Sequence, residues 1–209
     1  MKRFTTWIIV AAFGLALVGA LNGCAALGAL ADLKHLQFKL DNVSNFRLNG
    51  VDVSRAATKG DIGFSDIASL TAAVIQKRMP ADFTLNVAVR NPNTSSGGHA
   101  ATDLYLRKIA WTLSIDDRTT ISGVTDQRLQ IPGTGQTVNL PITMSVDLYK
   151  FFGDRGVDDL INLGLALGGR SGSASRLKLT ARVTAEVPPL APIEYPGDIT
   201  IVDKSFSNP

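Results

Sequence analysis

Three stretches of the chain alternate apolar and polar side chains with a period of two, and this pattern constrains the fold more than any other feature. The alternation is most regular in DFTLNVAVR (82–90), TVNLPITMSVDL (137–148) and LKLTARVTAEV (177–187). Successive side chains of a β-strand point to opposite faces of its sheet, so this period places the apolar side chains on one face. The three stretches therefore predict half-buried strands whose apolar faces line a core.

Four further stretches predict strands from a less regular pattern: 36–53 with a break near Asn45, 104–115, 120–131 and 199–202. Between Leu106 and Ile109 the apolar side chains change parity, which predicts a bulge or a bend. Pro141 interrupts the second alternating stretch. Because proline has no N–H to donate to a ladder, that strand is expected at a sheet edge or bent at this residue.

Two segments show helical spacing instead. In the segment 65–79 the apolar residues recur every three to four positions, Ser65 is the expected N-cap, and Pro80 is expected to end the element. The segment 154–167 shows the same spacing, and Gly168-Gly169 is expected to end it. Together, these strands and helices predict an all-β fold. The expected architecture is an antiparallel sandwich of immunoglobulin or fibronectin-III type, with about seven strands and two short helices in its connections.

The beginning of the chain has the layout of a secretory signal, with Lys2 and Arg3 ahead of an apolar run over 7–20. This run is shorter than the ~20 apolar residues that span a bilayer. The next residues, LNGC (21–24), resemble the bacterial lipobox, in which a diacylglycerol is attached to the cysteine sulfur before cleavage on its amino side. The resemblance implies cleavage between Gly23 and Cys24 and a lipid anchor on Cys24.

Lipidation would also explain why Cys24 is the only cysteine, since an unpaired thiol in an exported chain is otherwise reactive. The alternative is an uncleaved signal anchor that ends in a small apolar Cys24. In Gram-negative lipoproteins the residue after the cysteine sorts between membranes. Ala25 at this position implies the outer membrane, facing the periplasm, so the expected partner is the membrane that holds the anchor.

The expected organisation is a signal peptide over 1–23, a lipidated tether over 24–34, a β-sandwich domain over 35–204 and a tail over 205–209. Without Lys2 and Arg3 the 21 basic residues fall to 19, against 18 acidic ones, so the processed chain is nearly neutral. No basic cluster with interleaved aromatic residues is present, which argues against nucleic-acid binding.

The first alternating strand runs directly into Asn91, Pro92 and Asn93. This arrangement resembles the late-embryogenesis-abundant type 2 family, also called the water-stress and hypersensitive-response domain, in which an alternating strand leads into an Asn-Pro-Asn turn. The resemblance spans 36–202 and implies a role in desiccation or osmotic stress through weak contacts with proteins or lipid surfaces. The residues themselves indicate a turn, because Asn bonds backbone amides and Pro stops the ladder. A binding role for the motif stays open.

The sequence offers no set of residues suited to catalysis. His35 and His99 lack the neighbouring ligands of a zinc site, and the glycine-rich stretches GTGQT and GGRSGSAS lack the features of a phosphate loop. Asp116-Asp117 indicates a turn between strands, and Asp158-Asp159 indicates the first turn of a helix. We therefore expect no enzymatic activity, no metal and no cofactor.

Three functions remain at this stage. The first is a lipid-anchored, stress-protective binding module. The second is a periplasmic carrier or sensor of an apolar ligand, with the two helices closing a cavity between the sheets. The third is a structural subunit of an envelope complex, docked through the strand that contains Pro141. A hydrolase ranks last because no catalytic set is visible.

Overall fold

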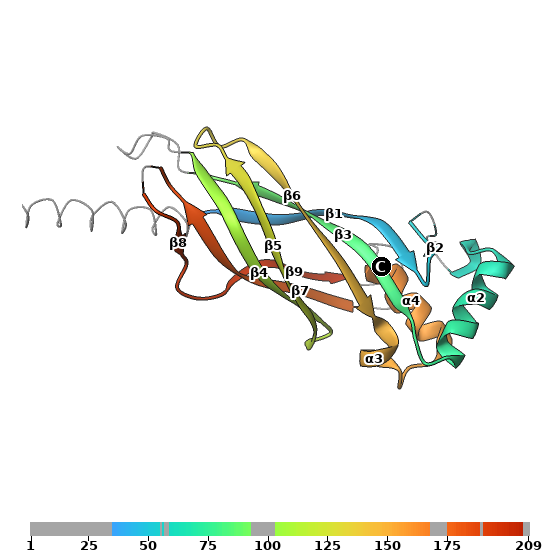
Figure 1. Ribbon diagram of the computed structural model, residues 1–209. Coiled ribbons are helices and arrows are strands. Elements are labelled where there is room, and N and C mark those ends of the chain that lie inside the picture. The colour runs from blue at the N-terminus through green and yellow to red at the C-terminus, as the bar shows by residue number, and fades with distance from the viewer. Residues whose placement is uncertain are drawn as a thin grey trace, which may run out of the picture.

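The computed structural model describes residues 35–54, 56, 59–92, 103–167, 175–188 and 190–206. The predictions for Gly23, Cys24, Asn93, His99 and Gly168-Gly169 fall outside these ranges. Within them, two antiparallel sheets form an elongated sandwich (Figure 1).

The first sheet has the order β2-β1-β3-β6, and the second has the order β5-β4-β7-β8, with β9 also paired to β7. The strands of the first sheet are β1 (Gln37–Leu48), β2 (Val51–Asp52), β3 (Pro80–Arg90) and β6 (Thr137–Asp147). Those of the second are β4 (Leu104–Ile115), β5 (Arg118–Ile131), β7 (Ser175–Glu186), β8 (Ile193–Glu194) and β9 (Ile199–Phe206). The predicted antiparallel sandwich is confirmed, with seven long strands and two strands of two residues.

The core consists of the inward side chains that the period-two pattern selects. In β3, Phe83, Leu85, Val87 and Val89 are fully buried, and the ring of Phe83 stacks on Phe46 with centroids 5.5 Å apart. Each such side chain contributes about 1.5–3 kcal/mol on burial. The matching inward residues of the other long strands are Leu106, Ile109, Leu113, Ile115, Leu140, Ile142, Met144, Val146, Leu177, Leu179, Ala181, Val183 and Ala185.

Of the predicted irregularities, the break near Asn45 is a bulge: Asn45 has a positive φ of 55° and the register of β1 against β3 shifts between Ser44 and Arg47, but β1 continues to Leu48 and the chain turns at Asn49-Gly50. The other two are confirmed. In β4 the register shifts between Leu106 and Lys108 against both neighbouring strands, which moves the later side chains to the other parity. β6 is an edge strand, and Pro141 pairs with Asn86 of β3 on its one hydrogen-bonded side.

The first predicted helix exists, but its ends differ from the prediction. α2 (Phe64–Ile75) has Gly63 as its N-cap with no side-chain cap, so Ser65 lies inside the first turn and the prediction of a Ser65 cap was wrong. The backbone carbonyl of Gly63 accepts the N–H groups of Asp66 and Ile67 instead. At the other end, Lys77 turns the chain with a φ of 58°, and Pro80 begins β3 rather than ending the helix.

The second predicted helix is α4 (Val157–Leu167), which begins three residues later than expected. A short helix ahead of it, α3 (Leu148–Phe152), was not predicted because Leu148 continues the alternating pattern of β6. The side chain of Asp147 ends the strand and starts the helix. Its Oδ1 accepts the N–H groups of Tyr149, at 3.0 Å, and of Met79, at 2.8 Å, and so caps α3. A single 3₁₀ turn, η1 (Lys59–Asp61), precedes α2.

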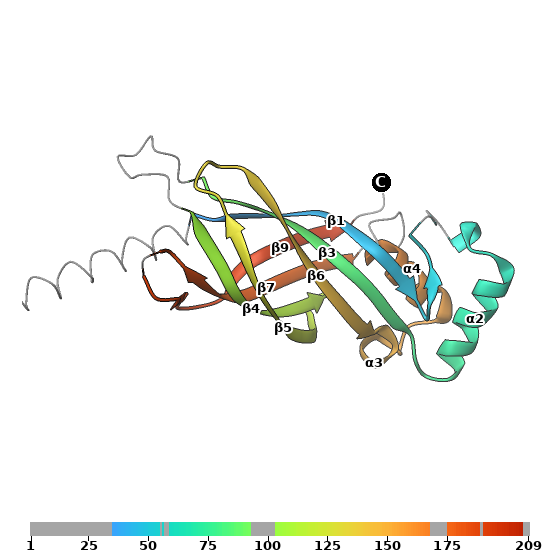
Figure 2. The same ribbon diagram turned by 45° about the horizontal axis from the view of Figure 1, so that its top comes forward.

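The three helices gather at one end of the sandwich, and β1 begins at the opposite end (Figures 1 and 2). The α4 face toward the sheets is buried, and Gly164 packs so closely that a Cβ atom there would lie 2.6 Å from Cδ1 of Leu48. The tip of the β4–β5 hairpin is tied to the α3–α4 connection by an ion pair of 2.9 Å between Arg155 and Asp116. Over the described part of the chain, none of the helices has the length and apolar character required to cross a bilayer.

We expect Gly164→Ala to lower the free energy of unfolding by about 1–3 kcal/mol, because the added methyl group has no space against the buried Leu48. Urea denaturation would measure the change. Gly156→Ala is the matched control, since nothing lies within 4 Å of a Cβ at that glycine. In the double variant Leu48→Ala/Gly164→Ala the losses should be less than additive. Fully additive losses would contradict the proposed contact.

Candidate binding groove

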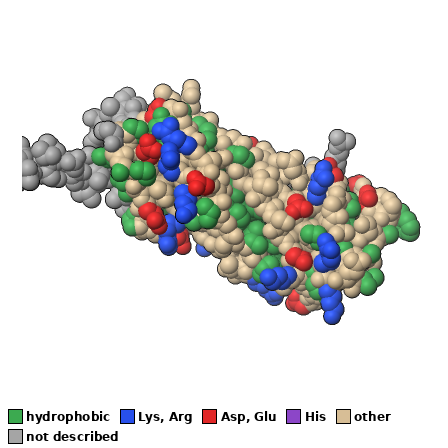
Figure 3. Space-filling model, viewed as in Figure 1, with side chains coloured by type: hydrophobic (Ala, Val, Ile, Leu, Met, Phe, Trp, Pro, Cys, Tyr) green, Lys and Arg blue, Asp and Glu red, His purple; other side chains and the backbone are tan. Residues whose placement is uncertain are grey.

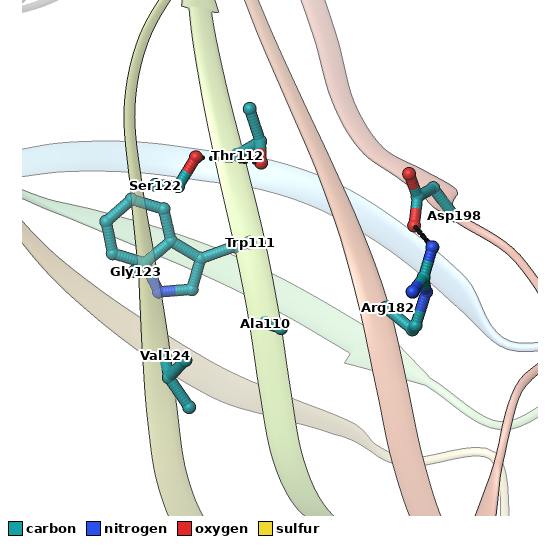
Figure 4. A pocket seen from close by; sticks show the side chains of 8 residues that line it. All are labelled: Ala110, Trp111, Thr112, Ser122, Gly123, Val124, Arg182 and Asp198. Carbon is teal, nitrogen blue, oxygen red and sulfur yellow. Dashed lines mark hydrogen bonds and ion pairs between the residues drawn. The ribbon is translucent and has the colours of Figure 1, made fainter.

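The outer face of the second sheet carries a shallow groove across the middle of β4, β5 and β7. Its volume is about 500 Å³, within the range of ~300–1,000 Å³ that is typical of ligand sites. The outward side chains of paired strands build it, because Ala110 lies opposite Val124 and Thr112 lies opposite Ser122. The groove is lined by Ala110, Trp111, Thr112, Ser122, Gly123, Val124, Arg182 and Asp198 (Figure 4).

Trp111 is fixed in place by Gly123 of the neighbouring strand. The indole ring extends from β4 across Gly123 of β5, where a Cβ atom would lie 2.4 Å from Cζ2 of the ring (Figure 4). Glycine is therefore required for this close approach. The indole Nε1 donates a hydrogen bond of 3.2 Å to Oγ1 of Thr125, and the residue is 7% exposed. The ring belongs to the buried core, on the face of β4 opposite Ala110 and Thr112, so it supports the groove from beneath.

The remaining lining combines an apolar surface with paired polar groups. Val124 is 57% exposed, which is high for a valine. The hydroxyl groups of Thr112 and Ser122 lie 3.0 Å apart, and Nη2 of Arg182 lies 3.1 Å from Oδ1 of Asp198. An occupant would find one apolar contact, two hydroxyl groups and a charged pair. These groups are suited to weak binding of a partner whose own surface is partly polar and partly apolar.

The groove was not predicted from the sequence. The alternating pattern places Trp111 among the core residues, and it indicates no particular role for Gly123 inside its strand. An isolated glycine in a strand often marks a close approach, and that signal could have pointed to this region. The register that places Gly123 opposite Trp111 follows from the hairpin turn at Asp116-Asp117 together with a shift of one residue between Leu113 and Ser114.

The Asn-Pro-Asn motif begins where β3 ends. Asn91 directly follows Arg90 and is 1% exposed, and Pro92 comes next. Nε of Arg90 donates a hydrogen bond of 2.9 Å to the carbonyl oxygen of Gly135, in the turn between β5 and β6. The two described residues of the motif therefore lie at the end of a strand, as predicted, and the role of the motif as a turn or a binding element stays a prediction.

Asp103, just ahead of β4, holds the same β5–β6 turn. Its Oδ1 accepts the N–H of Gly133 at 2.9 Å, and its Oδ2 accepts Nε2 of Gln130 at 2.7 Å. These two hydrogen bonds, the backbone one first, lower the pKa of the Asp103 carboxyl group. The carboxylate therefore contributes to the stability of this end in its charged form.

The other residues noted in the sequence have structural positions. Asp116 and Asp117 both have positive φ, of 49° and 61°, and form the two-residue turn predicted between β4 and β5. Asp158 and Asp159 lie in the first turn of α4, as predicted. His35 is exposed in a turn before β1. No group of three or more potential metal ligands occurs among the residues that the structure describes.

A second hollow lies between β1 and β9, where the edges of the two sheets meet. Its volume is about 260 Å³, and it is lined by Phe38, Lys39, Leu40, Ile201, Val202 and Asp203. This volume falls below the usual range for small-molecule sites. None of these six lining residues belongs to α2 or α4, the two helices that were expected to close a cavity.

No family model matches the chain, and no curated protein matches it. Solved structures show a distant likeness. One, described as a candidate late embryogenesis abundant (LEA) protein, has 16% identity and a TM-score of 0.39, covering 92% of this chain and 85% of that one. The solution structure of AT1g01470 from Arabidopsis thaliana has 16% identity and a TM-score of 0.35, covering 64% and 73%. A crystal structure from Archaeoglobus fulgidus has 7% identity and a TM-score of 0.36, covering 62% and 86%. Likenesses this distant assign neither a family nor a function.

We expect Asp103→Asn to reduce the free energy of unfolding near pH 6 and to have little effect near pH 2. Because the folded-state pKa is lowered, the stabilisation is present above the unfolded pKa of about 3.9 and is lost as the pH falls through the lower folded value. Urea denaturation at both pH values measures the difference, with the exposed Asp126→Asn of β5 as a control. An equal effect of Asp103→Asn at both pH values would show that the charge is not involved.

Proposed function

We propose that this chain is a lipid-anchored envelope protein whose β-sandwich is a non-catalytic binding module. Its task is to protect envelope proteins or lipid surfaces during desiccation or osmotic stress. Cys24 would carry the anchor after cleavage at Gly23, and an outer-membrane location facing the periplasm follows from Ala25. The proposal for the anchor is supported by the signal-like residues ahead of Cys24, and the stress role by the resemblance around Asn91 and Pro92.

The observation that carries the binding role is the groove on the outer face of the second sheet. Its Val124 is exposed and does not contribute to the core, and its polar groups are paired with one another. The strands that form it rest on the buried Trp111. A preorganised surface of this kind can hold a partner without losing much side-chain freedom. Because contact with one valine and two hydroxyl groups is weak, many different partners could be held briefly, which suits protection better than a specific assembly.

The arrangement of the chain fits an anchored module. β1 begins at the end of the sandwich opposite the helices, so a lipid on Cys24 would hold that end nearest the membrane (Figure 1). The groove lies on the outer face of the second sheet, away from the buried faces, so partners can reach it.

The carrier alternative receives less support from the described cavities. The hollow between β1 and β9, of about 260 Å³, would enclose a small part of a lipid chain. At the helical end, Gly164 and Leu48 are in close contact, which is the packing of a filled core. We therefore retain the binding module as the proposed function.

The lipid anchor predicts that a labelled fatty acid will be incorporated into the wild-type protein in the bacterial cell and not into Cys24→Ala. The thioether needs the sulfur of the single cysteine, so loss of label should be complete. Ala26→Ser, two residues away, is the control and should keep the label. Equal labelling of Cys24→Ala and wild type would refute the anchor and leave the binding role to be judged separately.

The protective role predicts that the full chain, in mild detergent, preserves more activity of a drying-sensitive dehydrogenase than an equal mass of albumin. If the groove is responsible, Val124→Lys should remove about half or more of that protection, since a charge replaces the exposed apolar contact. Gln127→Lys adds the same charge to β5 outside the groove and should retain full protection. Protection no better than albumin would end the stress proposal, and an unaffected Val124→Lys would exclude the groove.

A further inference from the structure

α2 presents two large apolar side chains to water. Phe64, its first residue, is 90% exposed, and Ile75, its last, is 75% exposed. Eleven positions at about 100° each place them about 20° apart around the helix axis, on one face. Ala68 and Ala72 are exposed on the same side. We call this row the α2 stripe: Phe64, Ala68, Ala72 and Ile75.

The α2 stripe does not contribute to the core. The side of α2 that packs on the sandwich is formed by Leu70 and Ala73, which are buried. Hydrophobic side chains are seen at the end of the molecule that carries α2 in Figure 3. An exposed row of this kind on an otherwise polar helix surface is typical of an interaction site.

The charges near the α2 stripe are unevenly distributed. Asp66 is the one charged residue inside α2, and it lies about 200° around the axis from Phe64, away from the stripe. Lys77 and Arg78 follow the helix directly and are exposed. Neither forms an ion pair within the described ranges, whereas Lys59 near the start of α2 is paired with Asp158. The stripe thus ends near two positive charges that have no ion-pair partner among the described residues.

The geometry points to an anionic lipid bilayer as the occupant of the α2 stripe, with Phe64 and Ile75 entering the headgroup boundary and Lys77 and Arg78 contacting lipid phosphates. Helices that lie in the membrane interface combine an apolar face with basic residues in this way. A second copy of the chain fits less well. It would need acidic groups opposite Lys77 and Arg78, and Asp66 faces away from the stripe.

This second contact goes beyond the proposed function and does not depend on the anchor at Cys24. The two contacts are compatible with one bilayer. The twelve residues between Cys24 and Gln37 can span up to ~40 Å, and β1, also of twelve residues, extends ~40 Å toward the helices. The sandwich could therefore lie along the membrane, with its anchor at one end and α2 at the other.

Quenching by brominated lipid tests the proposal directly. The full chain carrying Phe64→Trp is reconstituted into vesicles of equal parts phosphatidylcholine and phosphatidylglycerol, with and without brominated acyl chains. Trp111, the tryptophan that remains after cleavage before Cys24, supplies the background. We expect the added emission of Trp at position 64 to fall about twofold with brominated lipid. Gln127→Trp, an exposed position on β5 outside the groove, is the matched control and should lose no more than the background.

Charge reversal tests the lipid class. In the Phe64→Trp protein, Lys77→Glu/Arg78→Glu should abolish the added quenching in these vesicles, and pure phosphatidylcholine vesicles should give little quenching in any variant. Absence of added quenching at position 64 would overturn the proposal, and equal quenching in pure phosphatidylcholine would overturn its anionic part. Concentration-dependent dimers that Ile75→Asp dissociates would assign the stripe to a second copy instead. Fatty-acid labelling of Cys24 is unaffected by each of these outcomes.

Discussion

The structure depends on the burial of two apolar sheet faces against each other. With one cysteine in the whole chain, no internal disulfide can form, so the burial of residues such as Leu85, Leu113 and Leu179 is the main source of stability. This constraint fixes the parity of every long strand. It also determines what is left for function, because the outward positions of the same strands are free to carry polar and binding groups.

The strands followed from local patterns and could be predicted. Alternation selected the inward residues of β3, β6 and β7, and the change of parity between Leu106 and Ile109 located the bulge of β4. Because proline lacks the donor that an inner strand needs, Pro141 indicated either an edge strand or a bend, and β6 is an edge strand. In each case one residue or one short pattern contained the information, and no knowledge of distant partners was required.

One of the remaining features depends on a contact between distant segments. α3 forms because Asp147 binds both Tyr149 and Met79, and the second of these lies 68 positions away. Gly123 lies against Trp111 because the β4–β5 register shifts by one residue between Leu113 and Ser114, and the alternating pattern gave no sign of that shift. The start of α2 differs for a local reason: the backbone carbonyl of Gly63 accepts the first N–H groups of the helix, and a cap without a side chain leaves no residue type to recognise in the sequence.

The division between inward and outward residues also bears on α2. A helix that caps one end of a sandwich needs one apolar face, and Leu70 with Ala73 already supplies it. Phe64 and Ile75 add apolar surface in water without adding contacts to the core, so folding does not account for them. Their place at the end farthest from the start of β1 means that a contact there would orient the whole sandwich. Two separated attachments restrict rotation more than one, and they would hold the groove in a fixed direction relative to the surface beneath it.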